Sequence, residues 1–250
     1  MRQRHLKALL RWLSIVGFLC LWQLVVWWFE PSMLPSPPEV FTRLLAQWDS
    51  GELPQQLWVT VLRVLGSFFS AILLGAFLGI AMGHLPWLDS LLDGVVTIAL
   101  NIPALVVIIL CFIWFGLNEL SVISAVVINK APSMIVIFRE GARAIDFKLL
   151  EVARVFGLPW WRSFFQVYLP QLYPYFLAAT RSGLALVWKI VLVVELLGCS
   201  DGVGFQLGVF FQYFDITGIL AYTSAFVLLI LSIEVLLIRP WEKSVMRWRG

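Results

Sequence analysis

The residues of this sequence that could do chemistry are a few charged side chains inside long apolar segments. Lys130 lies in one such segment, and Arg181, Lys189 and Glu195 lie in another. A charge at the centre of a membrane helix costs about 2.5–3.5 kcal/mol on insertion scales, so such groups usually face a cavity or an opposite charge. Lys130 and Lys189 are therefore candidates for lining a passage used by an anionic or polar solute.

A second interpretation gives these charges a packing role. Arg181, Trp188 and Glu195 recur every seven residues and so share one face of a helix, with Lys189 about 100° around the axis from Trp188. All four join Lys130 as candidates for the path. Alternatively, Lys130 or Lys189 pairs with Glu195 or a backbone carbonyl and only fixes packing, and Arg181 ties a neighbouring loop to the helices.

Several kinds of chemistry are excluded by the residues that the chain lacks. It has only two histidines, so HExxH and histidine-cluster metal sites are excluded. None of its lysines follows a glycine, so it has no P-loop, and it has no G-x-S-x-G elbow. Its three cysteines form no CxxC pair, which argues against disulfide and metal roles. Energy must come from a partner protein or from an ion gradient.

The composition predicts a membrane protein. Of the 250 residues, 61% are hydrophobic and 13% are charged, whereas soluble domains carry about 25% charged residues. The apolar runs reach the roughly 18–20 residues that cross a bilayer, where only helices or closed barrels satisfy the backbone, and barrel-like alternation is absent. We expect an all-α polytopic integral membrane protein with one domain over 1–250. Its six transmembrane helices are expected over about 12–29, 58–82, 91–115, 120–138, 172–197 and 216–238.

The first apolar run has a second interpretation, as a signal peptide. Signal-peptide cores are usually about 7–15 residues long and end at small residues. Here the core continues to Phe29, with Trp27, Trp28 and Glu30 at its end. A retained membrane anchor is favoured.

Basic residues predict the orientation. With the N-terminus inside, thirteen of the eighteen Lys and Arg residues lie in four cytosolic pieces, 1–11, 83–90, 139–171 and 239–250. This bias follows the positive-inside rule and predicts that both termini are cytosolic. The net charge of +3 therefore reflects topology, and nothing indicates binding to nucleic acid.

Two features predict helix contacts. On the outside, Ser36 and Pro37 begin a short amphipathic helix that ends at Asp49-Ser50-Gly51 and is expected at the membrane surface. In the second span, small residues recur every fourth position and predict a seam where another helix, of this subunit or of a partner, approaches closely. They are Ala71, Gly75, Gly79 and Gly83.

Two prolines predict bends within the spans. Pro103 and Pro132 lie within the third and fourth predicted spans, where each can kink its helix.

The long cytosolic piece 139–171 predicts two short helices joined by a sharp turn. Asp146 lies near the start of the first helix and Arg154 near its end, which suits the helix dipole, and Gly157 stands where a C-cap glycine ends a helix. Pro159 can begin the second helix. One apolar stripe is expected on the first helix, from Leu149, Leu150, Ala153 and Phe156. An amphipathic loop of this kind can lie at the membrane surface without a partner.

The loop also contains a spaced sequence pattern. Glu151-Val152-Ala153 is followed after three residues by Gly157, and after nine more by Val167-Tyr168-Leu169-Pro170. This pattern resembles the EAA loop of type I ABC importer permeases, with Val152 and Val167 as mild departures. The resemblance implies that the loop is a coupling helix that docks on a separate cytosolic ATPase. The implied docking positions are Glu151, Ala153 and Gly157, with Leu150 and Arg154 beside them.

Shorter motifs extend the resemblance over nearly the whole chain, to the nitrate/sulfonate/taurine branch of these permeases. They are Leu34-Pro35-Ser36-Pro37, Ser50-Gly51-Glu52-Leu53, Leu62-Arg63-Val64, Trp114-Phe115-Gly116, Arg143-x-x-Asp146 and Arg247-Trp248-Arg249-Gly250. Members of this branch also carry bicarbonate and vitamin or pyrimidine precursors, so the resemblance does not fix the solute.

The resemblance implies a multi-pass permease in the bacterial inner membrane that works by alternating access. Its implied partners are a second permease copy, an ATPase dimer that holds ATP and Mg²⁺, an extracytoplasmic solute-binding protein and membrane lipid. The chain itself would bind no cofactor and would be no enzyme. The expected solute is small and anionic, with a vitamin or pyrimidine-type precursor as the alternative. A gradient-driven secondary transporter is a rival, but only Glu195 and Glu234 could relay its ions and no internal repeat is evident. A membrane scaffold or a membrane enzyme is a further rival, although no catalytic cluster is found.

Overall fold

The structure is a computed structural model that describes residues 2–29, 34–238 and 240. Its described part is built from helices and contains no strand. In chain order these are α1 (Arg2–Phe29), α2 (Pro37–Asp49), α3 (Glu52–His84), α4 (Pro86–Asn101), α5 (Ala104–Phe115), α6 (Glu119–Arg143), α7 (Phe147–Val155), α8 (Trp160–Ser163), the π-helix η1 (Phe164–Tyr168), α9 (Leu169–Gly198), α10 (Val203–Gln212), α11 (Ile216–Ile233) and the π-helix η2 (Glu234–Ile238).

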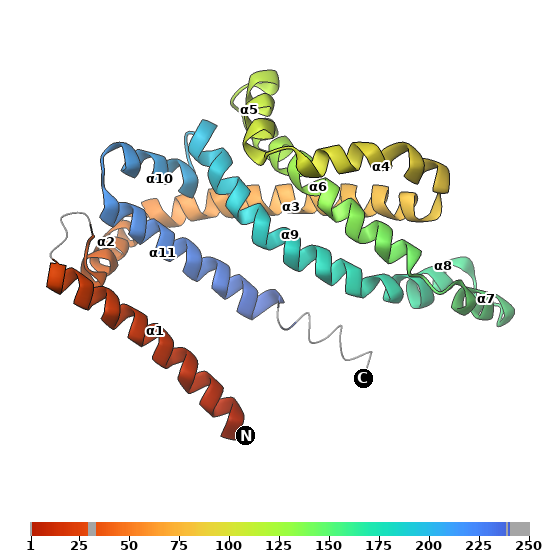
Figure 1. Ribbon diagram of the computed structural model, residues 1–250, viewed down its shortest axis with the longest axis horizontal. Helices are drawn as coiled ribbons and strands as arrows, with labels where there is room; N and C mark the ends of the chain where they lie inside the picture. Colours follow the sequence, from red (N-terminus) through yellow and green to blue (C-terminus); the bar gives the residue numbers. More distant parts are fainter. Residues whose placement is uncertain (1, 30–33, 239, 241–250) are drawn as a thin grey trace.

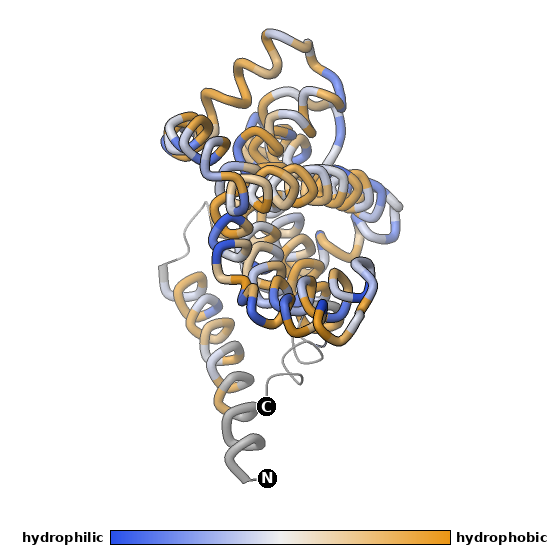
Figure 2. The backbone as a smooth tube through the Cα atoms, turned by 90° about the vertical axis from the view of Figure 1, so that its right-hand side faces the viewer, coloured by the Kyte–Doolittle hydropathy of each residue, from blue (hydrophilic) through white to orange (hydrophobic). Residues whose placement is uncertain are grey.

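Long helices form an elongated bundle in which α3, α6 and α9 run side by side (Figure 1). Hydrophobic residues predominate along most of their length (Figure 2). Among the described residues, four helices are long and apolar enough to cross a membrane, within α3, α6, the continuous helix from α8 to α9, and α11 with η2. The all-α membrane fold is thus confirmed.

The predicted third span, 91–115, is not one helix. It consists of α4 and α5, which meet at an angle of 100° and would together make a fifth span. The break lies at Ile102, whose backbone is extended because the ring of Pro103 disfavours a helical residue before it. The Asn101 side chain folds back on α4 and donates to the carbonyl of Thr97 at 2.8 Å.

The other predicted proline kink does not divide its helix, because Pro132 lies inside the continuous α6.

The first predicted span lies in α1, within which the described part of the apolar stretch, Val16–Trp28, is shorter than a full crossing. The number of six spans therefore stays a prediction, as does the orientation of the termini. The predicted cytosolic piece 239–250 lies outside the described residues, apart from Pro240.

The glycine seam of α3 packs against α6 of the same chain. A Cβ built at Gly75 would lie 2.5 Å from the Cβ of Met134, and one built at Gly83 would lie 2.5 Å from the Cβ of Ala142. These distances are below any real contact, so only glycine permits the two helix axes to come this close. The predicted seam is confirmed, and its partner is α6.

The short helix α2 begins and ends where the sequence predicts. Ser36 is its N-cap, and its backbone N–H donates to the Glu39 carboxylate at 2.9 Å. The helix packs against α3 and α11, so Val40 is buried while Phe41 and Trp48 are exposed. Some of its apolar residues thus pack in the bundle, and others lie on the exposed surface of the subunit.

Candidate functional site

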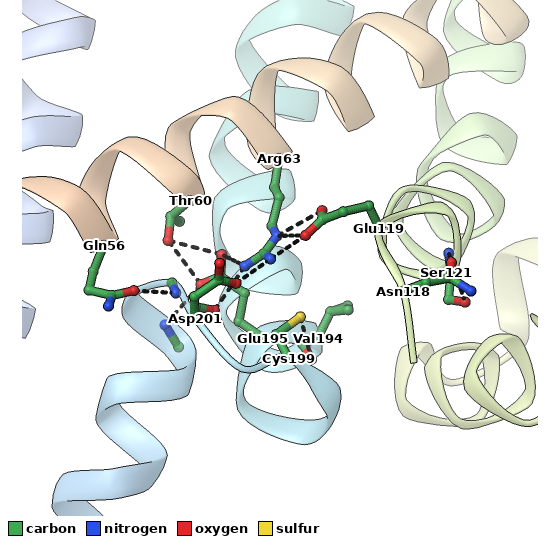
Figure 3. Close-up of polar contacts among 12 residues, drawn as sticks. Gln56, Thr60, Arg63, Asn118, Glu119, Ser121, Val194, Glu195, Cys199 and Asp201 are labelled. Carbon is green, nitrogen blue, oxygen red and sulfur yellow. Dashed lines mark hydrogen bonds and ion pairs between the residues drawn. The ribbon is translucent and has the colours of Figure 1, made fainter. Parts of the chain in front are cut away.

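Arg63 of α3 is the centre of a buried ionic network that joins three separate segments (Figure 3). Its guanidinium contacts the carboxylates of Glu119 at the start of α6, Glu195 near the end of α9 and Asp201 in the α9–α10 turn. The Nη1–Oε1 distance to Glu195 is 3.1 Å, and Nη1 also donates to the carbonyl of Asp201 at 2.9 Å. We call these residues, together with Gln56 and Thr60, the Arg63 network.

Glu195 is the most deeply placed member, with none of its side chain exposed. Its carboxylate accepts from the Thr60 hydroxyl at 2.9 Å, from Arg63, and from the backbone N–H of Gly204 at 2.9 Å. Thr60 in turn accepts from the N–H of Val203 at 2.8 Å. Because these are the first N–H groups of α10, the carboxylate and the hydroxyl satisfy donors that the helix cannot, and the negative charge faces the positive end of its dipole.

Gly202 permits the close approach of α10 to α9. Its φ is +98°, and an added Cβ would lie 2.4 Å from the Glu195 carboxyl carbon. Both the backbone conformation and the space exclude a side chain here.

Cys199 lies beside this network, after the end of α9. Burial raises the pKa of its thiol to about 11, because the thiolate would lose hydration there and would also face the network's carboxylates; Arg63 opposes this shift. The thiol therefore stays protonated near neutral pH, which disfavours a nucleophilic role.

The alternative that paired Lys130 or Lys189 with Glu195 is wrong. Arg63 holds that carboxylate, and among the described residues neither lysine forms an ion pair. Glu195 is thereby committed to the fold, which leaves only Glu234 of the two carboxylates considered for an ion-relaying secondary transporter.

The remaining candidates for the path do not form one cluster. Trp188 is buried, with its ring edge-on to Phe226 of α11 at a centroid distance of 5.6 Å, so we assign it to core packing. Lys130 is buried in α6, and no hydrogen bond of its ammonium is found in the described part of the chain. Lys189 and Arg181 are exposed on α9. Lys130 and Lys189 thus stay available for the predicted passage.

The loop between α6 and α9 has the local structure that its sequence predicts. Asp146 caps α7 by accepting from the N–H of Lys148 at 2.9 Å. Gly157, with φ +70°, ends the helix, and the N–H of Leu158 donates to the carbonyl of Ala153 at 3.0 Å. This is the bond of a Schellman motif. Pro159 then precedes α8, as expected.

The loop protrudes from one end of the bundle, where α7 and α8 lie beyond the ends of α6 and α9 (Figure 1). The predicted stripe is not all on one side: Ala153 is buried and Leu150 half-buried, whereas Leu149 and Phe156 are exposed. Since α7 packs on α8 and η1, the small Ala153 lies inside the loop. Glu151, Arg154 and Gly157 are exposed and accessible to a partner.

The most exposed apolar residues of the loop are ones that the sequence analysis did not single out for docking. Val155 and Trp160 are strongly exposed, and 81% of Phe156 is accessible. Phe156 follows the last residue of α7 and is exposed, although the sequence placed it on the apolar stripe. The signal that could have identified it was its place directly before the helix-ending Gly157.

Arg63, Glu119 and Asp201 of the Arg63 network were not among the predicted site residues, whereas Glu195 was predicted for the path. Arg63 and Glu195 are opposite charges near the ends of two predicted spans, and that complementarity was the available signal. Glu119 begins α6 and Asp201 lies in the α9–α10 turn, and no local pattern shows that the two are close in space.

Comparisons with known proteins agree with this architecture. The family model described as "Binding-protein-dependent transport system inner membrane component" matches residues 71–238, more than half of the chain. The aliphatic sulfonates transport permease SsuC of Escherichia coli (strain K12) is 32% identical over 204 residues, covering 80% of this chain and 78% of that protein. The taurine transport permease TauC of the same strain is 26% identical, covering 91% and 86%. The bicarbonate transport permease CmpB of Synechocystis is 27% identical, covering 77% and 72%.

A solved structure supports the fold. A chain of the MetNI methionine ABC transporter, in an inward-facing conformation, superimposes with a TM-score of 0.61 at 19% identity, covering 79% of this chain and 96% of that one. The predicted resemblance to the nitrate/sulfonate/taurine branch is confirmed by the sulfonate, taurine and bicarbonate permeases. With its helical bundle, its protruding loop and a family match over most of its length, the chain belongs to the binding-protein-dependent transport system inner membrane components.

Proposed function

We propose that this chain is the permease subunit of an ATP-driven importer that moves a small anionic solute across the inner membrane. Membership of the family carries this proposal, and the exposed loop at one end of the bundle supports the mode of energy supply. The related permeases are named for sulfonates, taurine and bicarbonate, solutes that share an anionic group. An external binding protein would deliver the solute to a pair of permease copies, and two cytosolic ATPases would drive transport.

The loop from Phe147 to Tyr168, which we call the docking loop, is the proposed contact with the ATPase. Its accessible face combines charge at Glu151 and Arg154 with apolar area at Val155 and Phe156. Buried aromatic anchors usually carry most of the energy of an interface. Phe156 is therefore the proposed anchor. Gly157 ends α7 directly after it and so fixes where Phe156 lies.

Phe156→Asp is expected to weaken co-purification with the ATPase subunit by about 30-fold or more, the loss typical of an interface hot spot. Glu151→Arg is expected to act in the same direction. Trp87→Asp is the matched control, because Trp87 is an exposed aromatic residue at the same end of the bundle but outside the loop. If Phe156→Asp and Glu151→Arg both retain the ATPase and ATP-dependent uptake, the docking assignment is wrong.

The proposed passage uses Lys130 and Lys189, which have no ionic partner within the described residues. Lys130→Met and Lys189→Met are each expected to lower uptake of the solute by about tenfold or more, because each removes a charge-assisted contact with an anion. Lys130→Arg, which keeps the charge, is expected to retain more uptake. Wild-type rates in both methionine variants would contradict the passage.

The solute class is tested with the full transporter in proteoliposomes. Labelled taurine, an alkanesulfonate and bicarbonate are compared with a neutral vitamin or pyrimidine precursor, each with its binding protein present. ATP-dependent uptake restricted to the anions is expected, whereas uptake of the neutral precursor alone would support the alternative.

A further inference from the structure

One side chain of α3 contacts both ends of the docking loop. His84 is the last residue of α3, and its Nε2 lies 2.6 Å from the hydroxyl oxygen of Tyr168, the last residue of η1. The same ring stands edge-on to Phe147, the first residue of α7, at a centroid distance of 5.8 Å. Entry to and exit from the loop are therefore held at one point.

Gln171 of α9 makes a second link between the two ends. Its side-chain oxygen accepts from the backbone N–H of Asp146, the N-cap of α7, at 2.8 Å. Its side-chain nitrogen donates to the carbonyl of Val167 in η1 at 3.0 Å. The loop is thus fixed by side chains from α3 and α9 as well as by its own backbone, and we call this set of contacts the joint.

The joint rests on the most tightly packed helices of the molecule. Gly83, next to His84, places the last turn of α3 directly on Ala142 of α6. Farther toward the N-terminus of α3, Arg63 belongs to the ionic network. The 21 residues from Arg63 to His84 correspond to about 31 Å of helix. A displacement at His84 is therefore passed to the far end of the bundle through a helix that cannot slide freely on α6.

We propose that His84 and Gln171 are positioning residues that make the docking loop move as one body with α3, α6 and α9. The inference rests on the proposed function, because it takes the loop to be the part on which the ATPase acts. Without the joint, force applied to α7 would be absorbed by movement of the loop itself. The exposed Phe156 lies nine residues from Phe147, about 13 Å along the helix, so the joint can be removed while the docking face stays intact.

The functional test uses the complete transporter with His84→Ala, Gln171→Ala and Tyr168→Phe. We expect each to keep the ATPase bound and to raise the ATP hydrolysed per solute imported several-fold. His84→Gln, which can still hydrogen-bond to Tyr168, is expected to restore much of the ratio. Tyr168→Phe should add nothing in the His84→Ala background, because the two residues share one contact. Ser90→Ala, which removes a hydroxyl from α4 outside the joint, is the control.

Hydrogen exchange on the isolated permease tests the joint without the ATPase. Amides of α7 are expected to exchange about fivefold faster in His84→Ala, the ratio for loss of one net hydrogen bond, while amides in the middle of α6 are unchanged. Unchanged exchange in α7, an unchanged ATP-to-solute ratio, or loss of the bound ATPase in His84→Ala would each overturn the proposal. Failure of the proposed function looks different: the wild-type permease itself would neither retain the ATPase nor import anions.

Discussion

Arg63→Met is expected to destabilise the permease by about 3–5 kcal/mol, the cost of leaving a buried charge without its partner. Glu195 has no exposed surface and would keep only the Thr60 hydroxyl and the Gly204 N–H as donors. The variant would also remove the guanidinium that joins the end of α9, the turn before α10 and the start of α6. The measurement is the free energy of unfolding in mixed micelles.

Two further variants separate the buried pair from its exposed neighbours. Glu119→Gln is expected to cost about 1 kcal/mol or less, because 62% of this side chain is accessible and water can replace its bond to Arg63. The double variant Arg63→Met with Glu195→Met is expected to regain part of the stability, since it removes both charges. It cannot regain all, because Thr60 and Gly204 lose their acceptor. Equal, small effects of Arg63→Met and Glu119→Gln would show that the network does not hold this end of the bundle.

The parts of the site that the sequence predicts correctly are those set by neighbouring residues. Each of these residues affects only the backbone close to it in the sequence. In the structure, Asp146 caps α7, Gly157 makes the left-handed turn that ends it, and Pro159 with its fixed φ precedes α8. The four-residue spacing of the α3 glycines likewise predicts a packing seam from neighbouring residues. The sequence did not decide whether the helix that packs there belongs to this subunit or to another, and the structure identifies it as α6.

The Arg63 network is a property of the tertiary fold, and its pairings could not be read from spacing. Glu119 and Glu195 are 56 and 132 positions from Arg63 along the chain, and the α9–α10 turn must return to α3 before the contacts exist. The break between α4 and α5 was underestimated for a related reason. A proline permits any bend from a slight kink to a full break, and the neighbouring helices select among them.

The joint was missed because its residues carry no signal individually. Tyr168 carries a signal only as part of the loop pattern, and His84 is a histidine with no partner in the local sequence. Glutamine is common on protein surfaces, so Gln171 alone does not indicate a structural role. Only the folded chain brings α3 and α9 to the two ends of the docking loop.

Gly79→Leu is expected to prevent α3 and α6 from packing, with an effect as large as that of Arg63→Met. A Cβ at position 79 would lie 2.5 Å from the carbonyl oxygen of Ile135 and 2.8 Å from the Cβ of Phe138. The first of these atoms belongs to the α6 backbone, so no side-chain rotation can relieve the clash. Even Gly79→Ala should destabilise, although alanine favours a helix by about 1 kcal/mol over glycine.

Gly94→Leu provides the matched control, because Gly94 also lies inside a helix and a Cβ there would meet no atom within 4 Å. The control should be neutral or slightly stabilising, while Gly79→Leu should lose at least the roughly 1–3 kcal/mol typical of overpacking and reach the membrane in a smaller folded fraction. The comparison is made by unfolding in micelles and by the monodisperse yield after purification. Equal behaviour of the two leucine variants would mean that α3 and α6 can separate at little cost. In that case α3 could not carry a displacement from His84 to Arg63, and the joint would need another route through α9.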